Sequence, residues 1–268
     1  MTYERLMEHA EDLRRLAVDV AMAIVEHDPL RRRGVERAFA DVPDEFRAVA
    51  HFPDPQSLGG PIDGMGSVLD GLSTGEDRPA EPGLARIGAA VAMLGGWSGE
   101  AAERFRDGFL APWPAFVRNQ YTVAAVLHSA LVAEREIWAR ARQDADRIAE
   151  QGLAAVAACT DCTRTEWTVT FTVMASVAAV VAVPLGGVPG VVLGGVAAVG
   201  QVMAVAGPDD PPRTSFSADD PGEVVERVRE AIRQLLGHVH ERRAAVAEAL
   251  RKTGQLVADR PELFGWKR

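Results

Sequence analysis

A long stretch without charge constrains this chain most. Between Glu166 and Asp209 the sequence contains no Asp, Glu, Lys or Arg, and Ala, Val and Gly make up most of it. A continuous apolar run of roughly 18 residues is enough to indicate a membrane-spanning or fully buried helix, and this run is about twice as long. The rest of the fold, a partner or lipid must therefore shield it from water.

Proline and glycine divide this stretch near its middle. Pro184 and Pro189 remove backbone donors, and the glycines around them weaken a helix interior, so one continuous helix is not expected. We predict two apolar arms, at about 168–183 and about 191–206, folded into a helical hairpin. Each arm would span roughly 24 Å, which is short of the hydrocarbon core of about 30 Å. Because Thr alternates with Val or Phe in the first arm, a β tongue stays open as the alternative.

Small residues form a stripe within the predicted hairpin. Gly186, Gly190 and Gly194 recur at every fourth position, and Gly195 follows directly. Such a glycine zipper lets helices approach closely, either in lipid or in a dry core. These four glycines are therefore the candidate positions for assembly or membrane contact.

Long amphipathic helices are predicted on both sides of the stretch. Apolar residues alternate at spacings of three and four over residues 3–25, over 115–158 and from Pro221 onward, with charged residues on the other faces. The last helix has a strong start signal, because Asp220 can cap it and Glu223 follows three residues later. The predicted buried seams are Tyr3, Leu6, Ala10, Leu13, Ala17, Val20 and Ile24; Val123, Leu127, Ala130, Ile137, Ala141, Ile148 and Ala155; and Val225, Val228, Ile232, Leu235, Val239, Val246, Ala249, Thr253 and Leu256.

Shorter elements are predicted between residues 26 and 114. A helix over about 31–51 is expected to be broken at Pro43. Residues 52–82 are rich in Pro, Gly, Asp and Ser, so we expect mostly loop, with a short helix at about 62–72. Helix is expected again at about 83–94.

These patterns together predict an all-α fold. We expect an elongated helical bundle of long antiparallel helices with a central apolar, glycine-rich helical hairpin. A content of 47% hydrophobic but only 6% aromatic residues is typical of such bundles. The expected regions are N-terminal helices and a Pro/Gly-rich loop (1–82), a helix-turn-helix (83–160), the apolar hairpin (161–208) and a C-terminal long helix packing back on the bundle (209–268).

Charge and motifs exclude several function classes. The net charge of −9 argues against nucleic-acid binding, which needs a concentrated basic face. The six histidines are scattered, and no nucleotide-binding, metal-binding or catalytic motif is present. We therefore expect a protein that is not an enzyme and uses no cofactor, metal or small-molecule substrate.

Cys159 and Cys162 form a single C-x-x-C pair at the predicted end of the long middle helix. No second pair and no βαβ context accompany them, so neither a zinc site nor a thioredoxin-like site is supported. Two half-buried thiols, or a possible local disulfide closing the turn before the apolar segment, remain as interpretations.

A tryptophan between glycines marks a tight turn between two predicted helices. The sequence Gly95-Gly96-Trp97-Ser98-Gly99 precedes an acidic helix start, for which Ser98 is the expected N-cap. This segment resembles the Trp-x-Gly turn of the WXG family, helical-hairpin proteins exported by type VII (ESX) secretion systems of actinobacteria and firmicutes. The positions that match the family pattern W-x-G-x-A-A-x-x-F are Trp97, Gly99, Ala102 and Phe105.

The resemblance covers about 83–160 and implies a helical partner, either another protein or a second copy. It also implies secretion without a Sec signal peptide, preceded by a cytoplasmic or membrane-associated stage. The N-terminal residues fit this because they lack the apolar region of a secretory signal. The family's Y-x-x-x-D/E export signal is not matched, because Ala125 lies four positions after Tyr121 and Met7 four after Tyr3. Pro112 and Pro114 also interrupt the second helix.

Three functions follow as hypotheses. The first is a non-enzymatic, type VII secretion-associated protein like the N-terminal region of larger WXG effectors, which assembles with helical partners and contacts membrane through the apolar hairpin. The second is a membrane-perturbing protein that resembles the cytolysin A type of α-helical pore-forming toxin in architecture. The third is a helical scaffold or adaptor whose apolar hairpin is buried in its own fold or oligomer.

Overall fold

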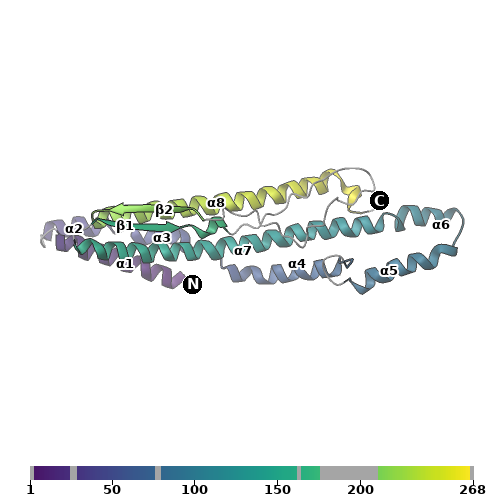
Figure 1. Cartoon of the computed structure of the whole chain (residues 1–268), viewed down its shortest axis with the longest axis horizontal. Helices are drawn as coiled ribbons and strands as arrows, with labels where there is room; N and C mark the ends of the chain where they lie inside the picture. The colour runs from purple at the N-terminus through teal and green to yellow at the C-terminus, as the bar shows by residue number, and fades with distance from the viewer. Residues whose placement is uncertain (1–2, 25–28, 76–79, 162–163, 176–210, 266–268) are drawn as a thin grey trace. The chain divides into compact units, whose positions relative to one another are not determined.

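The computed structural model describes residues 3–24, 29–75, 80–161, 164–175 and 211–265, and this part of the chain is mostly helical, as the all-α prediction requires (Figure 1). Its α-helices are α1 (Tyr3–Ile24), α2 (Pro29–Ala38), α3 (Val42–Ala50), α4 (Gly59–Gly71), α5 (Pro82–Met93), α6 (Glu100–Phe105), α7 (Trp113–Ala158) and α8 (Pro221–Asp259). Two strands, β1 (Thr165–Thr170) and β2 (Arg213–Ala218), form a small sheet.

The chain divides into two compact units. Unit 1 comprises the described residues within 1–56, 135–177 and 206–243, and unit 2 comprises those within 57–134 and 244–268. The division falls inside α7 and α8, so each unit takes segments from several of the regions expected from the sequence.

In unit 1, α1 packs against α3, and both elements follow the predicted pattern. The break in the second predicted helix is confirmed, with α2 ending at Ala38 and Pro43 lying in the first turn of α3. The predicted stripe of α1 is buried from Leu6 to Val20, whereas Ile24 is 55% exposed. The buried stripe residues are Leu6, Ala10, Leu13, Ala17 and Val20.

Three helices of unit 1 meet at Gly152 of α7. A Cβ atom at this position would lie 2.7 Å from Val228 Cγ2 on α8 and 3.5 Å from Leu13 Cδ2 on α1. Farther along, the Arg243 guanidinium of α8 lies 4.8 Å from the ring centroid of Trp138 on α7. Residue number rises along α8 where it falls along α7, so these two helices run in opposite directions within unit 1.

The start of α8 has the predicted cap. The Glu223 N–H donates to Asp220 Oδ1 at 3.0 Å, and Glu223 Oε2 accepts from the Asp219 N–H at 2.9 Å. These bonds satisfy donors that a helix start leaves without intrahelical partners. The predicted seam of α8 is buried at Val225, Val228, Ile232, Leu235, Val239 and Val246. Its last predicted members, Ala249, Thr253 and Leu256, are only partly buried.

The two strands correct the predicted start of the apolar hairpin. β1 and β2 pair antiparallel, from Thr165 opposite Ala218 to Thr170 opposite Arg213. The helical arm predicted from about residue 168 is therefore wrong at its beginning, and the strand alternative matches there. The β-branched side chains of this segment fit a paired strand better than a helix. Thr172–Ala175 form a short 3-10 turn. From residue 176 to 208 the predicted hairpin lies outside the described residues, together with Gly186, Gly190, Gly194 and Gly195.

In unit 2, α4 and α7 share a small apolar cluster. Leu69 of α4 packs with Tyr121 and Ala124 of α7, and Met65, Leu72 and Ala125 complete the contact. The prediction of mostly loop over residues 52–82 is wrong in part, because α4 begins at Gly59 and occupies 13 residues. The α7 seam also differs here, since Leu127 is 39% exposed while Tyr121 and Ala124 are buried.

The long middle helix and the helix before the Trp97 turn are confirmed, as α7 and α5. Near the start of α7, Asn119 Nδ2 donates to the Leu263 carbonyl at 2.7 Å and Gln120 Nε2 to the Phe264 carbonyl at 2.8 Å. These bonds attach the residues that follow α8 to α7 within unit 2. Among the residues that the structure describes, no helix combines the length and apolar character needed to cross a bilayer.

Candidate functional site

The β1–β2 pair closes the base of the charge-free stretch. The rings of Trp167 and Phe216, on opposite strands, lie 5.5 Å apart, and the hydroxyls of Thr168 and Ser215 are 3.1 Å apart. Beyond the ladder, the Phe171 N–H donates to the Pro212 carbonyl at 2.9 Å. The two chain ends that lead into residues 176–210 are therefore held side by side. We call this region, residues 164–175 and 211–218, the segment base.

A buried carboxylate on α7 fixes the segment base. Asp144 is fully buried; its Oδ1 accepts from Thr172 Oγ1 at 2.7 Å and its Oδ2 from the Val173 N–H at 2.8 Å. Burial raises the pKa of Asp144, against the opposing effects of these two hydrogen bonds and of Arg147, which lies 3.3 Å away. The carboxylate thus holds the turn that leads directly into the charge-free residues.

Arg147, one turn farther along α7, adds a second attachment. Its Nη1 donates to the Thr170 carbonyl at 3.2 Å and its Nη2 to Thr172 Oγ1 at 3.3 Å. On the other side, Thr214 Oγ1 of β2 donates to Gln234 Oε1 of α8 at 2.9 Å. The segment base is therefore attached by side-chain hydrogen bonds to both long helices.

Apolar packing completes the attachment. Val169, Phe171 and Val173 are each fully buried. The ring of Phe171 contacts the imidazole of His238 on α8, edge to face at 5.0 Å between centroids. Burial lowers the pKa of His238, so the neutral imidazole is favoured against Phe171. This arrangement holds the segment base in place, because the carboxylate oxygens of Asp144 accept hydrogen bonds from Thr172 and Val173.

One signal in the sequence could have identified Asp144. The buried seam of α7 includes Ile137, Ala141 and Ile148, and residue 144 lies on the same helical face. A carboxylate on a predicted apolar stripe needs buried hydrogen-bond donors. The donors themselves, Thr172 and the Val173 N–H, come from beyond the end of the helix and have no comparable signal.

The Trp97 turn joins helical segments as expected. α5 ends at Met93, a short 3-10 turn follows at Leu94–Gly96, and α6 begins at Glu100. The N-cap residue is Gly99, not Ser98 as predicted, with φ 102° and ψ 168°. Residues that carry a side chain rarely adopt this backbone conformation, so the turn requires glycine at this position.

An aromatic ladder extends from this turn. Neighbouring ring centroids are separated by 5.7 Å for Trp97 and Phe105, 5.2 Å for Phe105 and Phe109, and 5.8 Å for Phe109 and Trp113. Trp97 is 45% exposed, whereas Ala102 in the same motif is fully buried. Phe109 and Trp113 were not identified from the sequence, although the four-residue steps from Phe105 to Phe109 and from Phe109 to Trp113 are the helical signal for such a row.

Cys159 is buried at the end of α7. Its thiol donates to the Ala155 carbonyl at 3.3 Å, and burial raises its pKa. Cys162 lies outside the described residues, so the disulfide between the two remains a prediction.

Comparisons of the chain with protein-family models, curated proteins and solved structures find no match.

Proposed function

We propose that this protein perturbs membranes, without catalysing a reaction, by placing residues 176–208 of its charge-free stretch into lipid. In this proposal the long helices form an elongated antiparallel bundle, comparable in architecture to cytolysin A-type toxins. The single observation that carries it is the segment base, which attaches both ends of the stretch to α7 and α8. A stretch held in this way can move into lipid as one hairpin while the helices stay outside.

Charge supports the same division between lipid and water. The flanks of the stretch are charged or polar, with Arg164 and Glu166 before it and Asp209, Asp210 and Arg213 after it. A charged side chain at the bilayer centre costs about 2.5–3.5 kcal/mol on insertion scales, so the flanks mark where insertion would stop. Between them, the stripe of Gly186, Gly190 and Gly194 would allow close packing of the two arms.

Leakage of dye from liposomes tests the proposal. The protein is added to phosphatidylglycerol/phosphatidylcholine vesicles loaded with self-quenched carboxyfluorescein, at several pH values between 4 and 8. We expect release by the wild type and at least a tenfold slower release by Val181→Asp and Val192→Asp, because each places a charge in the apolar stretch. Replacing Gly190 and Gly194 by leucine should also slow release.

The matched control is Val68→Asp, because Val68 is 46% exposed on α4 and lies far from the stretch in sequence. This variant should release dye as the wild type does. If the wild type neither binds nor permeabilises vesicles at any of these pH values, the membrane proposal is wrong and the scaffold or adaptor function is favoured.

The aromatic ladder favours a second candidate, a WXG-like protein associated with type VII secretion that pairs with a helical partner. Trp97, Phe105 and Phe109 are each more than one third exposed, and Met93 is 85% exposed. Contiguous exposed apolar side chains commonly mark protein interfaces. This candidate predicts that the protein disappears from the culture medium of a host strain whose type VII ATPase is deleted; unchanged secretion would contradict it.

A further inference from the structure

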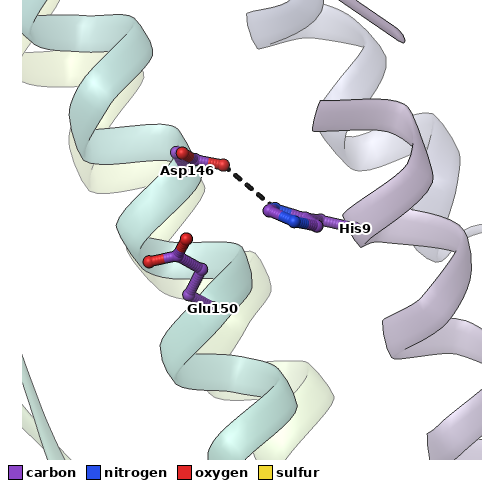
Figure 2. A group of neighbouring side chains, drawn as sticks. All are labelled: His9, Asp146 and Glu150. Atoms are coloured by element: carbon purple, nitrogen blue, oxygen red, sulfur yellow. Dashed lines mark hydrogen bonds and ion pairs between the residues drawn. The ribbon is translucent and has the colours of Figure 1, made fainter. Parts of the chain in front are cut away.

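We propose that His9, Asp146 and Glu150 bind one divalent transition-metal cation of the Zn²⁺ class, which links α1 to α7. Figure 2 shows the imidazole of His9, on α1, facing the carboxylate of Asp146, on α7, with Glu150 one turn farther along the same helix. The site is independent of the proposed membrane activity. It lies wholly within unit 1.

The three donor atoms already lie close together. His9 Nδ1 is 3.0 Å from Asp146 Oδ1, and the ligand atoms of all three residues are within 4.8 Å of one another. Zinc lies about 2.0–2.2 Å from nitrogen and carboxylate oxygen, so two donors on a tetrahedral ion are roughly 3.4 Å apart. The His9–Asp146 pair, at 3.0 Å, would need to open by only about 0.4 Å to reach this spacing. Glu150 needs only a change of side-chain rotamer, which its 52% exposure permits.

The helices hold the backbone of the site firmly. Asp146 and Glu150 are four residues apart, and therefore project from one face of α7. His9 lies between the fully buried stripe residues Leu6 and Ala10 of α1. Close packing of Leu13 against Gly152 fixes the same two helices about one turn farther along. The ligands are thus presented by a packed interface.

The charge and chemistry of the site suit a divalent cation. A neutral imidazole and two carboxylates supply a net charge of −2, and a mixed nitrogen and oxygen set is typical of zinc and similar metals. His9 and Asp146 have side chains about one fifth exposed, whereas Glu150 opens to solvent and leaves room for a water ligand. The cation would replace the direct His9–Asp146 contact with a coordinated link between the helices.

Arg5 is the competing cation. Its Nη2 lies 3.8 Å from Glu150 Oε1, and both side chains are more than half exposed. An exposed pair of this kind contributes little, so a metal ion can displace the guanidinium. Metal affinity should therefore rise when Arg5 is removed.

Zinc affinity is measured by competition with a fluorescent chelator on the full chain, with Mg²⁺ and Ca²⁺ as comparison ions. We expect His9→Ala and Asp146→Asn to weaken zinc binding at least tenfold, and Arg5→Ala to tighten it severalfold. Far-UV circular dichroism checks that each variant is folded. Co²⁺ substitution should give the visible absorption of a tetrahedral nitrogen and oxygen site in the wild type but not in His9→Ala.

Two control variants separate this site from other sources of zinc binding. His240→Ala removes an exposed histidine of α8. Cys159→Ser/Cys162→Ser removes both thiols of the C-x-x-C pair, which could bind zinc elsewhere in the chain. Both should bind zinc as the wild type does. The proposal is overturned if His9→Ala and Asp146→Asn keep wild-type affinity, if Arg5→Ala has no effect, or if the double cysteine variant abolishes binding.

Discussion

The two units differ in where they place their large apolar side chains. Among the described residues, the largest fully buried side chains are all in unit 1: Phe46, Phe171, Leu6, Leu13, Ile137, Ile148, Ile232, Leu235, Val42, Val49, Val156 and Val169. The exposed ones are almost all in unit 2: Val68, Val91, Met93, Trp97, Phe105, Phe109 and Leu127, against Ile24 alone in unit 1. Unit 1 is thus a packed core, and unit 2 presents apolar surface.

The two units therefore differ in how much their apolar side chains stabilise the fold. A fully buried large side chain stabilises a fold by about 1.5–3 kcal/mol, whereas a half-exposed one contributes much less. Unit 1 uses this burial to hold the segment base, with Asp144, Phe171 and Val173 all enclosed. Unit 2 leaves Trp97 and Phe105 partly exposed, at 45% and 37%. We infer that the packing that stabilises the fold resides mainly in unit 1.

The same substitution in each unit gives the largest expected contrast. Phe46 is fully buried on α3, so Phe46→Ala should lower the free energy of unfolding by about 3–5 kcal/mol. Phe105 is 37% exposed in the aromatic ladder, so Phe105→Ala should cost only about 1 kcal/mol. Urea titration followed by circular dichroism measures both. Equal losses would show that the two units are equally packed.

Overpacking tests the core of unit 1 next. Leucine at position 152 would meet Val228 and Leu13, so Gly152→Leu should cost about 2–3 kcal/mol. The matched control is Gly237→Leu on α8, where a Cβ atom meets nothing within 4 Å. That variant should gain up to about 1 kcal/mol from helix propensity. A harmless Gly152→Leu would mean that α1, α7 and α8 do not pack closely there.

Backbone geometry, rather than core burial, limits the Trp97 turn of unit 2. Gly99→Ala should cost about 1–2 kcal/mol, because alanine strains at φ 102°. Gly96→Ala, in the adjoining 3-10 turn, is the control and should be neutral or slightly stabilising, since space is open around its Cβ position. Thermal unfolding of the two variants compares them directly. Identical melting temperatures for the two variants would show that the turn does not require glycine at position 99.

Periodicity predicted the unit 1 side of the fold well and the unit 2 side less well. Along α7, Ile137, Ala141 and Ile148 in unit 1 are buried as predicted, whereas Leu127 in unit 2 continues the same stripe and is exposed. A stripe shows which face is apolar, but burial depends on what covers it.

The segment base could be predicted only in part, because its contacts join residues distant in sequence. Local propensity left strand open only as the alternative to helix for the Thr-rich segment that contains the end of β1, and its partner β2 lies beyond the charge-free stretch. The pairs of Asp144 with Val173 and of His9 with Asp146 likewise join residues far apart in the sequence, so local spacing does not predict them. The Trp97 turn could be predicted because Gly95, Gly96 and Gly99 lie next to Trp97 in the sequence and favour a turn there.

The smallest expected effect concerns pH and again belongs to unit 1. Because burial lowers the pKa of His238, the unfolded chain binds more protons than the folded chain just below the ordinary histidine pKa of about 6.5. The free energy of unfolding should therefore fall as the pH drops through this range. The charged groups around the imidazole are Glu241, Arg242 and Asp144, and the two carboxylates partly counteract the effect of burial.

Urea titrations between pH 7.5 and 5 measure this dependence. His238→Gln should flatten it, whereas the exposed control His240→Gln should leave it unchanged. Asp144 acts in the opposite sense at lower pH: with its pKa raised, the folded state binds more protons than the unfolded state down to about 3.9, and acidification there adds stability. A wild-type curve that is flat near pH 6.5 would mean that the contact with Phe171 does not desolvate His238. The enclosed packing that distinguishes unit 1 from unit 2 would then not extend to the segment base.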